Sequence, residues 1–281
     1  MSKIAVIGLV GNSAFLSVDS FHKGGETVVA KEIHFEVGGK GYNQAVAAAR
    51  FGAEVSFLGA VGEDFFGEVK NFSEKENIKP FLIKKEGNTA YASIITDKSG
   101  ETHVTVYQGV SLSEKDVDVF ENEIKTADIL LINNEVPEEV NIKGVKIAKE
   151  NGVRIIMNPA PYRDISNFIK DNVSYFTPNE HETKGIENKN NLIVTLGAKG
   201  CFIKEKNKSV SAIKVNSTDA TGAGDTFNGV LASMIGDGND LETAVKYAVV
   251  ASGLSVTKRY AVSSIPKREE IELHIKKQET K

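Results

Sequence analysis

Short apolar runs rich in β-branched residues alternate with helical patterns along most of this 281-residue chain. The runs predict strands at residues 3–10, 54–60, 128–133, 153–157, 174–177 and 191–196. Their nearly continuous apolar character is typical of strands buried on both faces, as in a parallel sheet. The helical patterns lie at residues 41–51, 64–77, 113–125, 137–151 and 226–235. This alternation predicts an α/β fold, because parallel strands are joined by crossover helices.

Two regions depart from the alternation and indicate a smaller second sheet. Residues 27–37 and 89–107 alternate apolar and polar residues with period two, and a DKSG turn divides the second region. Strands that leave one face polar fit a small sheet that stands off the main one, such as a lid. No repeat and no Pro/Gly/Ser-rich linker divides the chain. We expect a single domain over residues 1–281, with a lid formed by about 13–37 and 88–108.

The composition argues against several classes of function. The formal net charge of -4 gives no basic excess for nucleic acid, and no Lys/Arg run is typical of a membrane-surface patch. The short apolar run at the start lacks a signal-peptide cleavage pattern. The single cysteine, Cys201, has no partner for an intramolecular disulfide and suits a reducing compartment. We therefore expect a cytoplasmic protein without nucleic-acid or membrane partners.

The stretch STDATGAGDTFNG at residues 217–229 places two glycines before Asp225 and the predicted helix. It fits neither the P-loop pattern nor the dinucleotide fingerprint. A helix N-terminus presents unpaired N–H groups, and glycines let an anion approach them closely. The amides around Gly222, Ala223, Gly224 and Asp225 can therefore form an anion hole, with Asp225 as the base that accepts a hydroxyl proton in phosphoryl transfer. The alternative is that Asp225 is simply an N-cap.

A second glycine cluster lies in VGGKGYNQA, residues 37–45. Gly38, Gly39 and Gly41 precede a helix of small residues, and Lys40 and Asn43 are the strongly polar side chains near its start. A ligand with several hydroxyls that approaches the backbone closely would explain both the glycines and the polar pair. The alternative is a tight turn followed by close helix packing.

These two motifs resemble the two signatures of the ribokinase (PfkB) family of carbohydrate kinases. Between them, TPNEHE at 177–182 resembles the family's N-x-x-E motif, and TLGAKG at 195–200 resembles its nucleotide-binding loop. The order of motifs continues to VTKRYAVSSIP at 256–266, so the resemblance covers essentially the whole chain. It implies a Rossmann-like three-layer α/β/α sandwich with a mostly parallel central sheet and a small β-sheet lid.

The resemblance also implies an activity, which is ATP-dependent phosphorylation of a hydroxymethyl group of a small sugar, with ribose or a related pentose first. It implies that Asp225 is the catalytic base and that Gly222, Ala223 and Gly224 form the anion hole. The residues implied in sugar binding are Asn12, Ser13, Gly38, Gly39, Lys40, Asn43 and Glu135. An exposed loop acid is the alternative for Glu135.

The implied cofactors are ATP and Mg²⁺, the latter held by Glu182 through water. The residues implied in nucleotide binding are Asn179, Glu182, Thr195, Gly197 and Gly200. Many family members also bind an activating monovalent cation, here K⁺, and the matching positions are Asp219, Thr221, Ser255, Lys258, Tyr260 and Ser264. Asp219 could equally be a turn residue. Because the lid forms the dimer contact in ribokinases, we expect a homodimer.

Two departures from the family pattern bear on these expectations. Gly11 and Ser13 stand where the family usually has the Asn and Asp of an N-x-D motif, and a serine hydroxyl is a weaker acceptor than a carboxylate. A helix that is usual in the family is missing between Glu182 and Thr195. The alternatives are a nucleoside kinase, with an aromatic wall for the base from Phe15, Phe21 and Phe35, and a non-catalytic sugar- or nucleotide-binding regulator.

Overall fold

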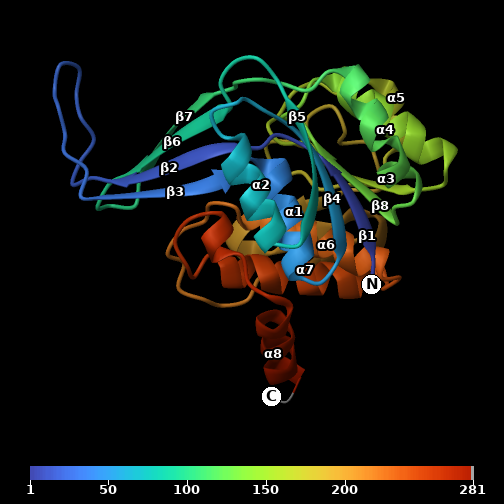
Figure 1. Cartoon of the computed structure of the whole chain (residues 1–281). Helices are drawn as coiled ribbons and strands as arrows, with labels where there is room; N and C mark the ends of the chain where they lie inside the picture. Colours follow the sequence, from blue (N-terminus) through green and yellow to red (C-terminus); the bar gives the residue numbers. More distant parts are fainter. Residues whose placement is uncertain (280–281) are drawn as a thin grey trace.

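The computed structural model describes residues 1–279 and is built around one six-stranded sheet (Figure 1). Its strands follow the order β10-β9-β8-β1-β4-β5, and all neighbouring strands are parallel. Their bounds are Lys3–Ile7 for β1, Glu54–Val61 for β4, Ile78–Lys84 for β5, Ile129–Asn133 for β8, Arg154–Asn158 for β9 and Tyr175–Phe176 for β10. Most of these strand residues are buried, as the apolar runs predict.

Helices cover both faces of the sheet (Figure 1). One face carries α1 (Lys40–Arg50), α2 (Phe66–Lys75), α6 (Ala223–Gly236) and α7 (Leu241–Ser255), with α8 (Arg268–Glu279) outside α7. The other face carries the 3₁₀ helix η1 (Glu114–Phe120), α3 (Glu121–Lys125), α4 (Glu138–Glu150) and α5 (Asn167–Asn172). The predicted three-layer α/β/α fold is therefore confirmed. Within residues 1–279, no helix has both the length and the apolar character that a membrane span requires.

A four-stranded sheet extends from one side of this body, and we name it the appended sheet (Figure 1). Its order is β3-β2-β6-β7. Its bounds are Gly11–Ser17 for β2, Glu32–Gly38 for β3, Ala90–Thr96 for β6 and Thr102–Tyr107 for β7. Both regions with period-two alternation contribute strands to it. The first predicted strand ends early, at Ile7, because the chain passes there from the main sheet into the appended one.

Two strand regions differ from the sequence-based expectation. β5 is a strand although it contains Pro80, which is tolerated because β5 is the edge strand of the main sheet. Residues 191–196 are predicted for the parallel sheet, but β11 (Ile193–Thr195) instead pairs antiparallel with β12 (Cys201–Ile203), which pairs with β13 (Lys208–Val210). Isolated parallel bridges connect β11 and its flanking residues to the chain around β10. The apolar pattern gives the strand but not its partner.

The order of the main sheet defines where a ligand can bind. β1 lies between β4 and β8, so the connections that leave the carboxyl ends of β1 and β8 run to opposite sides. A crevice forms at such a switch point in open α/β sheets. Helix α1 begins at this crevice and packs closely against the end of β1. A Cβ atom on Gly8 would lie 2.5 Å from the Cα atom of Gly41. The two glycines allow the start of α1 to approach the end of β1.

Candidate active site

Asp225 lies in the first turn of α6, and its side chain is buried. The N-cap of this helix is Gly222, which adopts a left-handed conformation with φ of 75°, so the N-cap interpretation of Asp225 is wrong. Its carboxylate accepts hydrogen bonds from Nδ2 of Asn43 at 3.0 Å and from Nε2 of Gln44 at 3.1 Å. Burial raises the pKa of Asp225, while Lys40 and the two amides act in the opposite direction. Asp225 is thus a buried, hydrogen-bonded carboxyl group with a raised pKa.

The backbone N–H groups beside Asp225 are only partly available to an anion. The N–H of Ala223 donates to the carbonyl of Ala220 at 3.2 Å, so this member of the predicted hole is engaged within the turn. In the part of the chain from 1 to 279, the N–H groups of Gly224 and Asp225 have no backbone acceptor outside α6. A Cβ atom on Gly224 would meet open space. The first turn of α6 therefore offers an anion the amides of Gly224 and Asp225.

Lys40 and Glu135 lie together at the start of α1. The backbone N–H of Lys40 donates to Oε2 of Glu135 at 2.7 Å. Burial raises the pKa of Glu135 to about 7, although the Lys40 charge opposes this shift. The pKa of Lys40 is raised chiefly by Asp225, and also by Glu135 and Glu182. Three carboxylates from distant parts of the sequence therefore act electrostatically on one ammonium group. Glu135 is not an exposed loop acid.

The glycine cluster at the end of β3 lies beside Ser13. A Cβ atom on Gly38 would lie 2.3 Å from Oγ of Ser13, and one on Gly39 would lie 2.5 Å from the carbonyl oxygen of Leu9. Neighbouring side chains of a strand point to opposite faces, so Asn12 points away from Ser13. Asn12 lines a hollow of about 640 Å³ between β3 and α2. The structure groups Ser13, and not Asn12, with the glycine cluster.

Asn179 and Glu182 form a reciprocally bonded turn after β10. Oδ1 of Asn179 accepts the N–H of Glu182 at 3.1 Å, and Oε2 of Glu182 accepts the N–H of Asn179 at 3.0 Å. The N–H of Thr195, at the end of β11, donates to the carbonyl of Pro178 at 2.8 Å. The N-x-x-E motif and the TLGAKG loop therefore lie side by side.

Gly197 and Gly200 shape the turn between β11 and β12. Their φ angles are 56° and 96°, in the region that favours glycine. A Cβ atom on Gly200 would lie 2.0 Å from the carbonyl oxygen of Val210, so close packing alone requires glycine there. A Cβ atom on Gly197 would meet open space.

Asp219 connects two segments of the expected cation site. Its Oδ1 accepts the N–H of Thr221 at 2.9 Å, and its Oδ2 accepts the N–H of Tyr260 at 2.8 Å. The ammonium of Lys258 forms an exposed ion pair with α8 instead. The remaining expected members, whose hydroxyls bond to carbonyls of their own turns, are Ser255 and Ser264. The structure thus brings Asp219, Thr221 and Tyr260 together.

Two residues at the centre of the site are missing from the sequence-based set. Nε2 of Gln44 also contacts Oδ1 of Asn158 at 3.2 Å, and Nδ2 of Asn158 donates to the carbonyl of Thr177 at 3.0 Å. Asn158 ends β9 at the carboxyl edge of the sheet, where ligand sites lie, and this position is a signal that the sequence offers. Gln44 is a polar residue on a helix of small apolar ones, which is a second signal.

A buried acid at a glycine-flanked helix start, above the switch point of an α/β sheet, is an arrangement suited to phosphoryl transfer. The sequence matches the family described as pfkB family carbohydrate kinase over residues 1–268. It is 35% identical over 298 residues to a ribokinase of Lactococcus lactis subsp. lactis, with 99% of each chain covered. The chain therefore belongs to the pfkB family of carbohydrate kinases.

Solved structures agree with this assignment. A ribokinase from Thermotoga maritima superposes with a TM-score of 0.88 at 32% identity, covering 98% of this chain and 100% of that one. The Arabidopsis thaliana ribokinase, in complex with ribose and ATP, superposes with a TM-score of 0.84 at 25% identity, covering 97% of this chain and 98% of that one. The similarity extends over the whole fold, including the appended sheet.

Proposed function

We propose that this protein transfers the terminal phosphoryl group of ATP to a hydroxymethyl group of a small sugar, with ribose as the first candidate. The observation that carries the proposal is the buried Asp225 carboxylate beside the free amides at the start of α6. The similarity to ribokinases over nearly the full chain supports the same reaction. A pure binding protein has no need of a buried base in that position.

In the proposed reaction, Asp225 takes the proton of the attacking hydroxyl. Its raised pKa brings it closer to the pKa range of an effective base at neutral pH. The amides of Gly224 and Asp225 stabilise the charge on the moving phosphoryl group. Lys40 supplies a positive charge beside both groups. Asn43, Glu135 and Ser13 would hold the other sugar hydroxyls.

ATP would bind at the adjoining turn, along Asn179, Thr195, Gly197 and Gly200. Glu182 suits Mg²⁺, because hard oxygen ligands and retained waters are typical of this ion. Its negative charge contributes to the raised pKa of Lys40, and its Oε2 accepts the N–H of Asn179. Mg²⁺ would neutralise charge on the phosphates, and Glu182 would orient its waters.

A monovalent cation, K⁺, would bind near Asp219, Thr221 and Tyr260, with carbonyl oxygens as most of its ligands. Ser255, Lys258 and Ser264 would contribute through their backbone.

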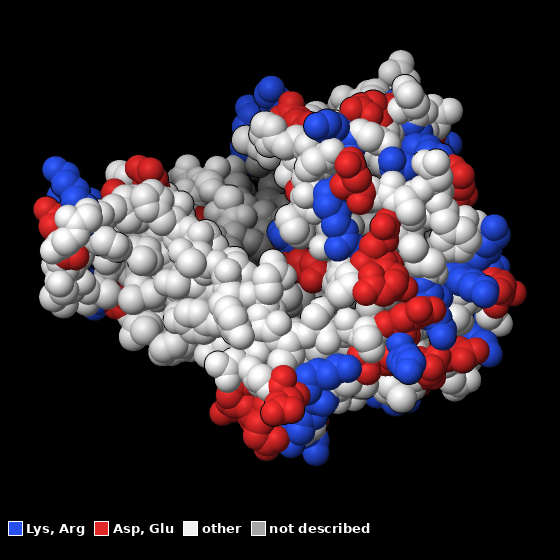
Figure 2. All heavy atoms as spheres, turned by 90° about the horizontal axis from the view of Figure 1, so that it is seen from above, with Lys and Arg blue, Asp and Glu red and all other residues white. Residues whose placement is uncertain are grey.

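We also propose a homodimer that forms through the appended sheet. Its exposed large apolar side chains on the face opposite Ser13 are Ile33, Phe35, Tyr91 and Tyr107. Figure 2 shows this part of the molecule as a white surface, whereas charged residues gather on the body and at the far end of the sheet. An exposed apolar patch of this kind is typical of a protein–protein interface.

The nucleoside-kinase alternative lacks its aromatic wall. Phe35 points to the face opposite Ser13, and Phe21 stacks on His103 in the outer part of the sheet at 3.7 Å between ring centroids. Phe15 is buried against Tyr260. None of the three leaves an open ring face beside the glycine cluster, so the geometry favours a sugar without a base.

The proposal is tested by measuring ADP release with Mg²⁺ and K⁺ over a panel of ribose, deoxyribose, hexoses and nucleosides. We expect turnover with a pentose and little with nucleosides. Omitting K⁺ should lower the rate if the cation site acts as proposed. Turnover confined to nucleosides would favour the alternative kinase, and ligand binding without turnover on any substrate would favour a regulator.

A further inference from the structure

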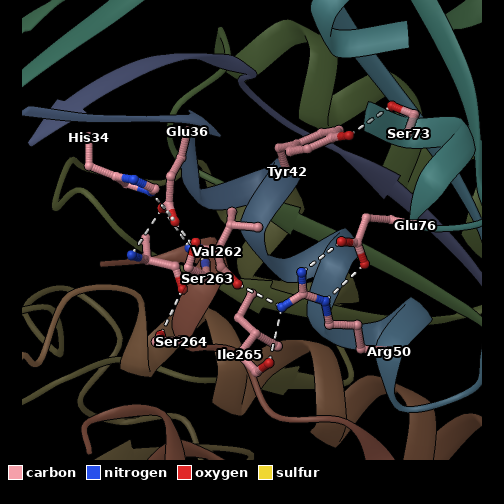
Figure 3. Close-up of polar contacts among 11 residues, drawn as sticks. His34, Glu36, Tyr42, Arg50, Ser73, Glu76, Val262, Ser263, Ser264 and Ile265 are labelled. Carbon is pink, nitrogen blue, oxygen red and sulfur yellow. Dashed lines mark hydrogen bonds and ion pairs between the residues drawn. The ribbon is translucent and has the colours of Figure 1, made fainter. Parts of the chain in front are cut away.

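A buried carboxylate connects the appended sheet to the C-terminal segment 260–264. Glu36 lies on β3 and is 7% exposed. Its Oε2 accepts the N–H groups of Ala261 at 3.1 Å and Val262 at 2.9 Å, and its Oε1 accepts the N–H of Ser263 at 2.8 Å. Nε2 of His34 lies 3.2 Å from Oε1 (Figure 3). Three consecutive amides of the segment thus converge on one side chain of the sheet.

Glu36 is also the cross-strand partner of Ser13, the position where the family usually has an aspartate. The two side chains share one face of the sheet. One alternative is therefore that Glu36 binds the sugar in place of the aspartate that Ser13 replaces. Its acceptor capacity argues against this, because a carboxylate has about four lone-pair positions and the three amides and His34 occupy them. Glu36 therefore acts through the segment and not on the sugar.

The segment that Glu36 holds lies against the start of α6. A Cβ atom on Gly222, the N-cap of α6, would lie 3.2 Å from Cα of Ala261. Tyr260, with φ of 75°, donates its N–H to Asp219, and its ring stacks on His34 at 3.9 Å. Direct contacts therefore connect β3 to the N-cap of α6, from Glu36 to Ala261 and from Ala261 to Gly222.

The body holds the same segment independently of the appended sheet. Nη1 of Arg50, from α1, donates to the carbonyls of Val262 at 2.7 Å and Ile265 at 3.0 Å (Figure 3). The same guanidinium pairs with Glu76 through two hydrogen bonds of 2.8 and 2.6 Å. Because Arg50 and Asp219 anchor the segment to the body, Glu36 contributes mainly its connection to the sheet.

We propose that Glu36 is a positioning residue that transmits the placement of the appended sheet over the sugar to the anion-binding start of α6. This inference rests on the proposed kinase function. A sugar held by Ser13 and Gly38 fixes β3, β3 fixes Glu36, and Glu36 sets Ala261 against Gly222. The amides of α6 then reach their working position when substrate is present, which limits hydrolysis of ATP in its absence.

The test compares Glu36→Gln with wild type in the full-length chain. Glutamine keeps the shape but offers a single acceptor oxygen and places an NH₂ group against backbone donors. We expect kcat for the sugar to fall about ten- to a hundredfold, the range for a lost charge-assisted hydrogen bond. ADP affinity without sugar should stay within about twofold, because Glu36 is not a nucleotide contact. Ribose should protect amides 261–263 from hydrogen exchange in wild type, and this protection should be lost in the variant.

The matched control is Glu32→Gln. Glu32 lies on the same strand and the same face, but it forms an exposed ion pair with Arg259. It should behave as wild type in all three measurements. If Glu36→Gln does not fold, Glu36→Asp keeps the charge on a shorter side chain, and the same changes are expected of it.

Wild-type kcat in the folded Glu36 variant would overturn the inference, as would a reduced kcat with unchanged sugar-dependent protection of amides 261–263. Failure of the proposed function is a different result, because wild type itself would then show no turnover. Hydrogen exchange with and without ribose would still decide whether Glu36 couples the sheet to the segment.

Discussion

At the residue scale, two opposing effects set the pKa of Asp225. Burial disfavours its charge, and Lys40, Asn43 and Gln44 favour it. The net effect is a raised pKa, so kcat should fall as the pH drops through this value. The acidic limb of the pH–rate profile should therefore lie above the range of an ordinary aspartate.

Asp225→Asn should lower kcat by about 10²–10⁴, the usual span for loss of a general base, and leave ATP affinity nearly unchanged. Steady-state kinetics and nucleotide binding check this. Asp237→Asn is the matched control, because Asp237 caps the other end of α6 and pairs with the chain N-terminus. Comparable turnover in both variants would contradict the role of Asp225.

The same Asp225 substitution should raise the thermal midpoint at pH values above the raised pKa of Asp225. There the ionised side chain lowers native-state stability, and asparagine removes that cost. As the pH falls through the raised pKa, the carboxyl takes up a proton and the difference from wild type should shrink. Thermal unfolding at several pH values measures it.

If Glu135 binds the sugar as proposed, sugar affinity should depend on pH, because burial raises the pKa of Glu135 to about 7. As the pH rises from about 6 to about 8, Glu135 becomes an ionised acceptor with stronger hydrogen bonds, so KM for the sugar should fall. Glu135→Gln should raise KM about tenfold and make it nearly independent of pH. A pH-dependent KM that persists in the variant would assign the titration to another group.

The site residues that could be predicted are those in a short motif whose residue types alone indicate a function. Asp225, Lys40 and Asn43 stand beside glycines at helix starts, and this local pattern identified them. Gln44 contacts Asp225 across 181 positions of sequence, and Glu36 contacts Val262 across 226. Such partners depend on how elements pack, which no local pattern contains.

At the element scale, the site depends on how closely α1 and α6 approach. A Cβ atom on Gly229 would lie 2.4 Å from the carbonyl oxygen of Gln44 and 2.5 Å from Cβ of Ala47. The absence of a side chain there lets α1 bring Asn43 and Gln44 against Asp225.

Gly229→Ala should separate the two helices, lower the free energy of unfolding by about 1–3 kcal/mol and reduce kcat. Gly67→Ala is the control, because Gly67 lies in the first turn of α2 with open space around it. That change should raise stability by up to about 1 kcal/mol. Urea unfolding and kinetics measure both variants. Equal stability in the two would show that the helices accommodate the extra methyl group.

The elements themselves were predictable where an apolar period was long enough. The pattern at 226–235 gives the core of α6, although the helix starts three residues earlier, in the glycine motif. The strand at 191–196 was predicted, but its antiparallel partner β12 and the next strand β13 are too short to show a period. β5 was not predicted because it contains Pro80. Proline argues against a strand unless the strand is known to lie at the edge of a sheet.

At the scale of the whole molecule, the two faces of the appended sheet present different side chains. One face carries Ser13 and Glu36 toward the body, and the other exposes Phe35 and Ile33. If the exposed face forms a dimer, each sheet is held rigid by its neighbour over its own sugar site.

Phe35→Glu should convert the proposed dimer into a monomer, because a charge in an apolar interface lacks a partner. It should also raise KM for the sugar, because the appended sheet would lose the support of its neighbour. Sedimentation velocity and kinetics measure the two effects. Val29→Glu is the control, since Val29 is 84% exposed in the loop between β2 and β3. A wild-type protein that sediments as a monomer at high concentration would contradict the dimer.

Tyr260 restricts how this protein can be redesigned. Its left-handed backbone costs a side chain about 1–3 kcal/mol, which glycine would avoid, whereas the stacking on His34 requires a flat ring. No standard amino acid satisfies both demands fully, so mutational tolerance at this position is narrow. Transplanting the segment into another scaffold therefore requires His34 to be transferred with it.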